Sequence, residues 1–371
     1  MDGFDVARDL VSIPSHEGEA SAGGYIAEWL DEHTDAEVTR DDAGGDDRGG
    51  NVVARRGSGD TTLALVGHHD VVPPDDSQVT DDGRYVVREG DGRLYGRGSA
   101  DMKGAVAAAM CAFRDAEVAA GTELVFVSAV GEEVGGVGAR AAIDRGFAPD
   151  YAVVGEGSTG YSGAGVTDVA VAHKGRRGSR LVAEGSTAHA SEPEAGENAI
   201  YRATEAVDVV RNLPVPTTEV LGHEVSGSVA VTEIEGGSAW NVIPQRCEVT
   251  VDERTVPGER APLDRIESVD GVTWTVEQDL LPMACDGPDF ADAVLTAARD
   301  AHDGEPADGQ PRQVVKPHAT DAGWLAEAGT TCVVCGPAEP GEAHTATESV
   351  SLAVLDRCYE TYRSVAESWS G

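Results

Sequence analysis

The residues with the clearest chemical potential are two histidines and several carboxylates, each beside glycine or at the end of an apolar run. Asp101 follows a glycine-rich run, Gly96–Gly98, and precedes an alanine-rich stretch that predicts a helix. Its carboxylate should therefore project from a tight loop. Taken alone, Asp101 is more typical of a plain turn residue. Taken together, the residues predict a site for two divalent metal ions, with these further candidates: His68, Glu132, Glu133, Glu156 and His344.

His68 and Asp70 stand two residues apart after an apolar run, 63–66, that predicts a strand. Side chains at positions i and i+2 lie on one face of an extended segment. Asp70 can therefore support His68, as carboxylates support metal-bound histidines. Two polar residues that close a strand are the alternative interpretation.

Glu132 and Glu133 are adjacent, so they need not perform the same task. One can bind metal while the other accepts and donates protons. A divalent metal lowers the pKa of a bound water molecule to about 7, so that the water readily gives up a proton. A carboxylate beside such a water can carry its proton to a leaving amine, which fits amide hydrolysis. The alternative is an acidic helix N-terminus, which the helix dipole favours.

The ligand types narrow the choice of metal. Imidazole nitrogen and carboxylate oxygen suit zinc, and one shared Asp suits two ions about 3.5 Å apart. Cobalt and manganese accept the same ligands. Cys332 and Cys335 have CxxC spacing, but no second pair accompanies them and they lie in an apolar run, which predicts two buried strand cysteines.

Alternating strand and helix patterns surround these residues. Strands are predicted over 52–55, 63–66, 124–130, 151–154 and 331–334, and helices over 4–13, 20–33, 106–119 and 133–145. This alternation predicts an α/β fold with a doubly wound, mainly parallel sheet. Ligands bind at the carboxyl ends of strands in such sheets, where His68, Glu132 and Glu156 are expected.

Between residue 156 and the strand at 331 the pattern changes. Strands are predicted over 175–184, 229–234, 247–253 and 272–276, with one amphipathic helix over 198–212. Helices over 290–302 and 352–368 and a polar loop over 303–312 follow. This pattern predicts an inserted α+β domain over 175–279, with the first fold formed by 1–174 and 280–371.

The chain of 371 residues has 66 acidic and 28 basic residues, a formal net charge of −38. The acidic residues are spread between apolar strand patterns, which favours a folded protein from a high-salt cytoplasm, where salt screens self-repulsion. The charge argues against nucleic-acid partners. The sequence predicts neither a membrane span nor a signal peptide, so we expect a soluble cytoplasmic protein without a membrane partner.

Seven motifs occur in a set order: GHHDVVPP, GRGSADMKG, GEEVGG, VVGEGS, STAHASEPEAGENAI, GGSAWNVIP and CGPAEPGEAHTATESV. With them the chain resembles the di-zinc aminoacylase/carboxypeptidase (M20) family, which includes acetylornithine deacetylase and succinyl-diaminopimelate desuccinylase. The resemblance spans nearly the whole chain. It implies a catalytic domain with an inserted lid or dimerisation domain, and two zinc ions as cofactors.

The resemblance also implies individual roles. Glu132 would be the proton shuttle, Asp70 would support His68, and a cis peptide would follow the bridging residue, at Asp101–Met102. The two metal positions would share Asp101, one being completed by His68 and Glu156 and the other by Glu133 and His344.

Within the insertion, His189 and Asn241 match family positions that contact the substrate or the transition-state oxygen, and Arg254 matches one that binds the substrate carboxylate. A turn histidine, a turn amide and a surface ion pair are the plain alternatives. Arg176, in GRRGS, resembles the desuccinylases and could answer a succinyl carboxylate, whereas AHASEPEAG lacks the aromatic residue that many desuccinylases carry there. In dimeric members the matching histidine acts in the neighbouring subunit, so we expect a homodimer with His189 acting in trans.

These observations favour a two-metal hydrolase that removes the acyl group from a small N-acyl amino acid, with the succinyl-diaminopimelate type preferred slightly over the acetylornithine type. A dipeptidase or carboxypeptidase with the same site is the alternative among enzymes. A non-catalytic binding protein is the alternative of another class, but a binding protein has no need of Glu132.

Overall fold

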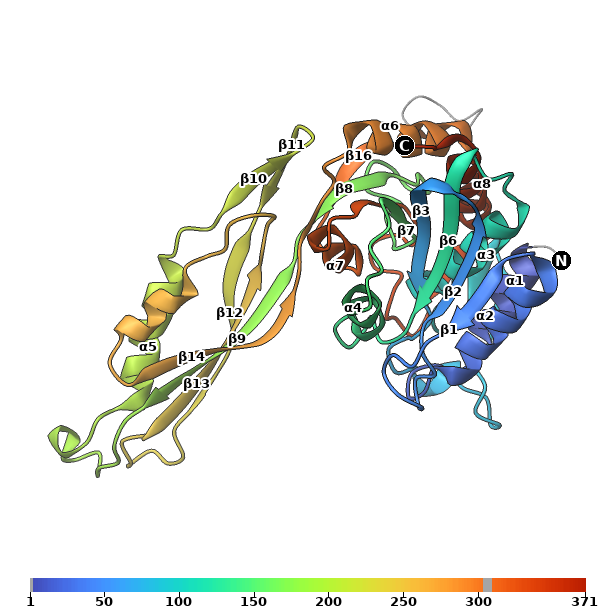
Figure 1. Cartoon of the computed structure of the whole chain (residues 1–371). Helices are drawn as coiled ribbons and strands as arrows, with labels where there is room; N and C mark the ends of the chain where they lie inside the picture. The colour runs from blue at the N-terminus through green and yellow to red at the C-terminus, as the bar shows by residue number, and fades with distance from the viewer. Residues whose placement is uncertain (1–2, 303–308) are drawn as a thin grey trace. The chain divides into compact units, whose positions relative to one another are not determined.

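The computed structural model describes residues 3–302 and 309–371, which fall into two compact units. Unit 1 comprises Met1–Ala172, Met283–Lys316 and Thr320–Gly371, and unit 2 comprises His173–Pro282 with Pro317–Ala319. The sequence placed the boundaries after residues 174 and 279; in the structure they fall after 172 and 282. Figure 1 shows the elements of both units, coloured by residue number.

Unit 1 is built on a large mixed sheet whose centre is parallel. Neighbouring strands β6, β3, β7 and β17 run parallel, whereas β2 pairs antiparallel with β6, and β8 antiparallel with β17. The sheet contains β1 (Glu37–Arg40), β2 (Val52–Gly57), β6 (Gly121–Ala129), β3 (Gly59–His68), β7 (Tyr151–Val154), β17 (Thr331–Val334), β8 (Val169–His173) and β15 (Met283–Ala284), with β16 (Gln313–Lys316) beside β8.

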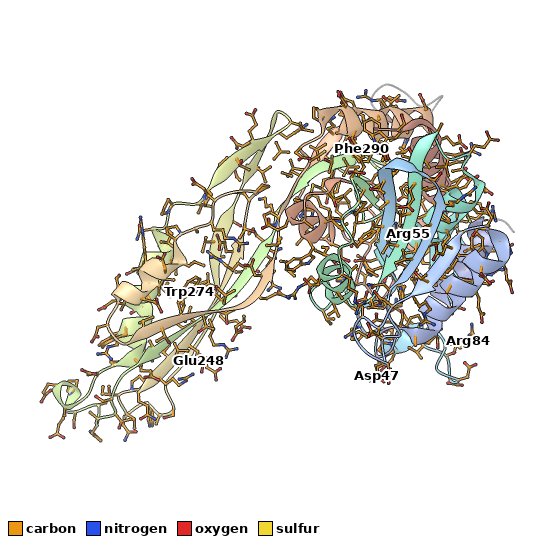
Figure 2. All side chains as sticks on the ribbon, viewed as in Figure 1. Asp47, Arg55, Arg84, Glu248, Trp274 and Phe290 are labelled. Carbon is orange, nitrogen blue, oxygen red and sulfur yellow. The ribbon has the colours of Figure 1, made fainter. Side chains whose placement is uncertain are left out.

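Helices cover both faces of this sheet. On one face, apolar strand residues such as Val66 and Val127 pack with Ala322 and Leu325 of α7 (Ala322–Glu327). On the other face, α3 (Gly104–Asp115) packs against β3 and β6, and also against α1 (Gly3–Val11) and α8 (Leu352–Ser368). The remaining helices of the unit are α2 (Ala20–His33), α4 (Val137–Asp144) and α6 (Pro288–Asp300). Phe290 of α6 packs against Tyr151 and Trp369 (Figure 2). The predicted α/β class with a mainly parallel, doubly wound sheet is thus confirmed.

A small sheet beside the main one matters for the site. It joins β4 (Arg88–Gly90), β5 (Arg93–Tyr95) and β18 (Ser349–Ser351), with Ser349 opposite Tyr95. It therefore ties the chain before Asp101 to the chain after His344.

Unit 2 is an α+β unit with a four-stranded antiparallel sheet in the order β12-β13-β9-β14. Its strands are β9 (Arg176–Glu184), β12 (Ser228–Gly236), β13 (Arg246–Arg254) and β14 (Val272–Leu280), with a separate hairpin of β10 (Thr217–Val220) and β11 (His223–Ser226). The helix α5 (Ala199–Arg211) covers one face, where Val249 and Val251 pack with Ala203 and Ala206. Trp274 packs at the edge of this core (Figure 2).

Some predicted elements differ from the observed ones. The helix predicted from Glu133 begins only at Val137, because residues 132–135 form a turn and Gly135 and Gly136 have φ of 103° and 71°. The helix predicted to reach 119 ends at Asp115. In the loop predicted over 303–312, residues 303–308 lie outside the described residues. All six cysteines are free and buried, Cys332 and Cys335 included. Among the helices of the described residues, none is long and apolar enough to cross a membrane.

Candidate metal centre

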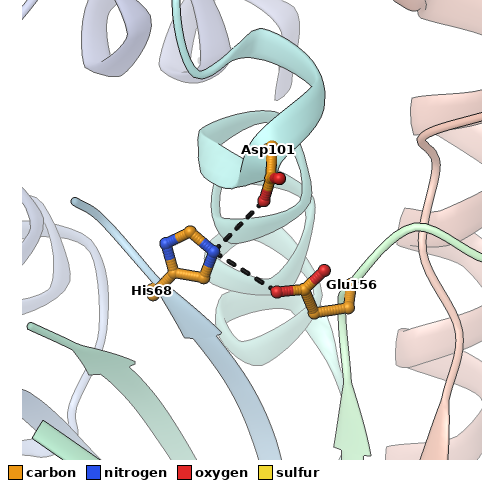
Figure 3. Close-up of side chains that lie close together, drawn as sticks. All are labelled: His68, Asp101 and Glu156. Atoms are coloured by element: carbon orange, nitrogen blue, oxygen red, sulfur yellow. Dashed lines mark hydrogen bonds and ion pairs between the residues drawn. The ribbon is translucent and has the colours of Figure 1, made fainter. Parts of the chain in front are cut away.

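The first cluster of candidate ligands forms around His68, which ends β3. The imidazole Nε2 lies 3.2 Å from Asp101 Oδ1 and 3.3 Å from Glu156 Oε1 (Figure 3). All three side chains come from different segments: the end of β3, the loop before α3, and the residues after β7. His68 and Glu156 are buried.

The second cluster uses the other oxygen of Asp101. His344 Nε2 lies 3.1 Å from Asp101 Oδ2 and 3.0 Å from Glu133 Oε1. In each cluster the candidate ligand atoms lie within 4.8 Å of one another. Each triad offers one imidazole nitrogen and two carboxylate oxygens, a donor set that suits zinc and related divalent ions. The shared carboxylate fits a two-ion site.

Strand ends and irregular turns bring these side chains together. His68 lies opposite Ala129, the last residue of β6, so Glu132 and Glu133 follow at the same edge of the sheet. A cis peptide joins Asp101 to Met102, as expected from the resemblance. His344 has a φ of 63°, in the left-handed region that few residues other than glycine adopt.

Asp70 does more than support His68. Its carboxylate lies 3.3 Å from His68 Nδ1, and it also accepts hydrogen bonds from the backbone N–H groups of Glu132 at 3.1 Å and Glu133 at 3.0 Å. One buried carboxylate therefore contacts an imidazole of one cluster and fixes the turn that supplies a ligand to the other.

Burial controls the proton affinity of the two adjacent glutamates. It raises the pKa of Glu132 well above its ordinary range, and the negative charge of Glu156 raises it further. Burial also raises the pKa of Glu133, against an opposing hydrogen bond with His344. A carboxyl group with a raised pKa can carry a proton at neutral pH, as a proton shuttle must.

The carboxylates in turn hold positive charge on both imidazoles. Hydrogen bonds to Asp101 and Glu133 raise the pKa of His344 to about 10, against burial. Burial disfavours a charged His68, but hydrogen bonds to Asp101 and Asp70 outweigh it and raise the pKa of His68. Such a cluster of acids calls for nearby positive charge, and two divalent cations would supply it.

Comparisons with known proteins show the family of this chain. The model of the peptidase family M20/M25/M40 matches residues 64–368. This chain belongs to that family. It is 32% identical over 330 residues to acetylornithine deacetylase of Myxococcus xanthus, covering 83% of this chain and 81% of the relative.

Solved structures show the same fold at low identity. The chain is similar to aminopeptidase PepT from Bacillus cereus, with a TM-score of 0.76, 19% identity, and 98% and 97% of the two chains covered. It is also similar to a Bacillus subtilis protein described as a dinuclear metal-binding peptidase of the M20 family, with a TM-score of 0.68, 16% identity, and 98% and 96% covered. As an M20 member with acetylornithine deacetylase relatives, this chain is a metal-dependent amidohydrolase.

Unit 2 of this M20 chain brings two predicted residues together. His189 forms a bridge with Val242, and the N–H of Ala190 donates to the backbone oxygen of Asn241 at 2.9 Å. His189 and Asn241 are both exposed, and the His189 ring contacts Ser191 Oγ at 2.7 Å. The chain segments that carry these two residues are therefore neighbours.

The predicted arginines of unit 2 share a single carboxylate. Arg176 Nε donates to Asp252 Oδ2 and Arg254 Nε donates to Asp252 Oδ1, both at 2.7 Å. Asp252 was not singled out in the sequence. Two guanidinium groups around one carboxylate leave one net positive charge, which is enough for one anionic group of a ligand.

Lys316 and Asp321 lie near the candidate ligands, both close to Glu156, but were not singled out from the sequence. Lys316 Nζ lies 3.5 Å from Glu156 Oε2 and donates to the backbone oxygen of Gly157 at 2.8 Å, so it fixes the segment that carries this ligand. Asp321 is buried, and among the described residues neither of its carboxylate oxygens has a hydrogen-bond partner. The sequence did offer one signal for Lys316: it is one of only three lysines in the chain, so a specific role for it could have been suspected.

Proposed function

We propose that this chain hydrolyses the amide bond of a small N-acyl amino acid with two divalent ions, zinc being the best fit. The main support for this proposal is the Asp101 carboxylate, whose two oxygens face two separate imidazole–carboxylate pairs. The expected ligands are His68 and Glu156 with Asp101 at one position, and Glu133 and His344 with Asp101 at the other. The family membership supports metal dependence.

In this proposal, the two clusters would hold divalent ions, whose chemistry would be Lewis acidity toward the scissile carbonyl and a lowered pKa of water. Glu132 accepts the proton of the attacking water and delivers it to the nitrogen of the leaving amine. Its raised pKa suits the second half of this cycle, in which the carboxyl group must hold the proton. Asp70 keeps the Glu132 backbone and the His68 ring in fixed directions.

The two arginines around Asp252 support a substrate with one carboxylate for this cluster. Arg176 and Arg254 already share Asp252, so their remaining charge matches one anionic group better than two. This count favours an N-acetyl amino acid, such as N-acetylornithine, over an N-succinyl one. The Myxococcus relative is an acetylornithine deacetylase, which supports the same choice.

A side-by-side substrate panel tests the proposal. Zinc-loaded protein in molar KCl is given N-acetylornithine, N-succinyl-diaminopimelate, other N-acetyl and N-succinyl amino acids, and dipeptides, and release of free amine is measured. The expected result is the highest kcat/KM for an N-acetyl amino acid. A preference for N-succinyl substrates would instead support the desuccinylase hypothesis from the sequence, and a preference for dipeptides would identify a peptidase.

The proposal also includes a homodimer in which His189, beside Asn241, acts on the site of the partner subunit. His189 is exposed in unit 2 and has no metal-ligand candidate within that unit among the described residues. Its expected role is to donate to the oxygen that gains charge in the transition state.

A further inference from the structure

A buried ion pair lies behind the loop that carries Asp101. The Nη1 of Arg97 donates to Glu348 Oε2 at 2.6 Å, and the two side chains are only 4% and 1% exposed. The other oxygen, Glu348 Oε1, accepts the backbone N–H groups of Ala100 at 3.0 Å and Asp101 at 3.2 Å. One carboxylate therefore binds a guanidinium group on one side and two amides of the Asp101 loop on the other.

Glu348 also belongs to the segment that presents His344. Its N–H donates to the backbone oxygen of Thr345 at 3.3 Å, and its own backbone oxygen accepts the N–H of Gly96 at 3.1 Å. The next residue, Ser349, starts β18, which pairs with β5 just before Gly96. The segments that carry Asp101 and His344 are therefore joined through the backbone and again through the Glu348 carboxylate.

A buried ion pair by itself is a weak explanation for stability, because apolar groups of similar volume often serve the fold as well. The two amide contacts have a role that a charge pair alone does not have, because they bind one particular stretch of backbone. They fix the backbone at Asp101, and the direction of the Asp101 carboxylate depends on that backbone. The Glu348 carboxylate thus joins the Arg97 guanidinium group to the backbone of the Asp101 loop.

We propose that Glu348, held by Arg97, is a positioning residue that sets the direction of the Asp101 carboxylate and keeps it in register with His344. The inference rests on the proposed function, in which Asp101 serves both metal ions. An error in the direction of a shared ligand weakens both positions at once, whereas an error in the direction of Glu156 would weaken only one.

Two variants separate positioning from simple stabilisation. In Glu348→Gln, one amide oxygen cannot accept from the guanidinium group and from the two backbone N–H groups together, and its NH₂ group must face one set of donors. In the double variant Arg97→Met/Glu348→Leu, the buried charges are gone and the core remains apolar, but Ala100 and Asp101 lose their acceptor. Stabilisation alone predicts normal metal binding by the folded double variant.

Unit 2 offers a matched control. Arg177 Nε donates to Glu253 Oε2 at 2.5 Å, the side chains are 10% and 2% exposed, and Glu253 Oε1 accepts the backbone N–H of Ala261 at 2.8 Å. This pair has the same chemistry, but the loop behind it carries no metal-ligand candidate. The double variant Arg177→Met/Glu253→Leu should therefore bind metal as the wild type does.

The experiment is carried out in molar KCl on proteins whose fold is checked by circular dichroism. Zinc binding to metal-free protein is titrated by calorimetry, and the visible absorption of the cobalt-substituted protein reports ligand geometry. We expect both Arg97/Glu348 variants to bind both ions at least about tenfold more weakly, with an altered cobalt spectrum; a tenfold change is about 1.4 kcal/mol. The unit 2 control should show neither change.

Folded variants with wild-type affinity at both positions and an unchanged cobalt spectrum would overturn the inference, and so would a loss confined to one position. If Glu348→Gln does not fold, the double variant decides by the same two measurements. Failure of the proposed function is a different result, because wild-type protein would then bind no zinc pair or would bind it without hydrolysing any substrate of the panel.

Discussion

Asp101 differs from the other candidate ligands because both of its carboxylate oxygens are engaged, one in each cluster. Asp101→Ala should therefore abolish high-affinity binding of both ions, whereas Glu156→Gln should lose only one. Zinc content after dialysis, measured by plasma mass spectrometry, checks both variants. Two retained ions in Asp101→Ala would remove the bridging role.

In the proposed function, Glu132 moves protons and is not a metal ligand. Glu132→Gln keeps the size of the side chain but cannot accept a proton, so kcat should fall at least about 10²-fold, the lower end for general acid–base catalysis. Zinc content should remain at the wild-type level. Steady-state hydrolysis of the best panel substrate measures the effect, and near wild-type turnover would assign the proton transfer to another group.

At the scale of elements, buried carboxylates hold the turns from which the candidate ligands project. Asp70 accepts from Glu132 and Glu133, Glu348 accepts from Asp101, and Glu19 accepts from the backbone N–H of Gly131 at 3.0 Å. Strand ends supply the position of each ligand, and these acceptors fix its direction. A site built from irregular loops can thereby be as fixed as one built on strands.

Glu19 gives this arrangement a pH dependence. Burial, and then the charge of Asp70, raise the pKa of Glu19 from 4.5 to about 7, although Arg48 opposes them. Because the pKa of Glu19 is higher in the folded protein than in the unfolded chain, the protonated carboxyl group favours folding. This contribution to stability is full below pH 4.5 and is lost as pH rises to about 7. In Glu19→Gln, which cannot ionise, this loss is absent.

The free energy of unfolding of Glu19→Gln should therefore rise relative to wild type as pH increases through this window. Urea unfolding at a series of pH values in molar KCl measures it. The exposed Glu17, replaced by Gln in the same way, is the control and should follow wild type. Parallel curves for Glu19→Gln and wild type would contradict the assignment.

Apolar runs made the main sheet predictable. The strands β7 and β17 have the predicted bounds, since their residues are buried on both faces and read as continuous apolar runs. The small sheet of β4, β5 and β18 was not predicted, because its strands are only three residues long and contain polar residues. The helix start at Val137 was misplaced because turn geometry, set by Gly135 and Gly136, overrode an acidic pattern that suits a helix N-terminus.

The candidate ligands could be named from residue types and motif order, but their supports could not. Asp70 was expected to contact His68, yet its two backbone partners depend on the tertiary approach of the turn after β6. Glu348 and Asp252 look like ordinary acids in a chain that has 66 of them. Only the fold shows that one holds the Asp101 loop and the other joins two arginines.

For the whole molecule, the net charge of −38 predicts that stability depends on salt concentration. Self-repulsion among surface carboxylates is screened over about 3 Å at 1 M salt but over about 10 Å at 0.1 M. The free energy of unfolding should therefore increase steadily between about 0.1 and 2 M KCl. Urea titrations at each concentration measure it, with sucrose as an uncharged control that leaves the repulsion unscreened. Equal stability at both ends of the KCl range would contradict a salt-adapted surface.

The assembly is the remaining property of the whole molecule, and subunit mixing tests it. His189→Ala and Glu132→Gln chains should each be nearly inactive, the first because it lacks the expected donor to the transition-state oxygen, worth about 3–4 kcal/mol. If His189 acts in trans, a heterodimer contains one site with an intact Glu132 from one chain and an intact His189 from the other. Mixing under conditions that exchange subunits should then restore activity. Because one of the two sites in each heterodimer is intact, the heterodimer should reach up to about half of the wild-type activity. Differently tagged chains allow the heterodimer to be isolated and its activity measured directly. An inactive heterodimer would show that His189 serves its own chain, since Glu132 and His189 would then never be intact in the same site.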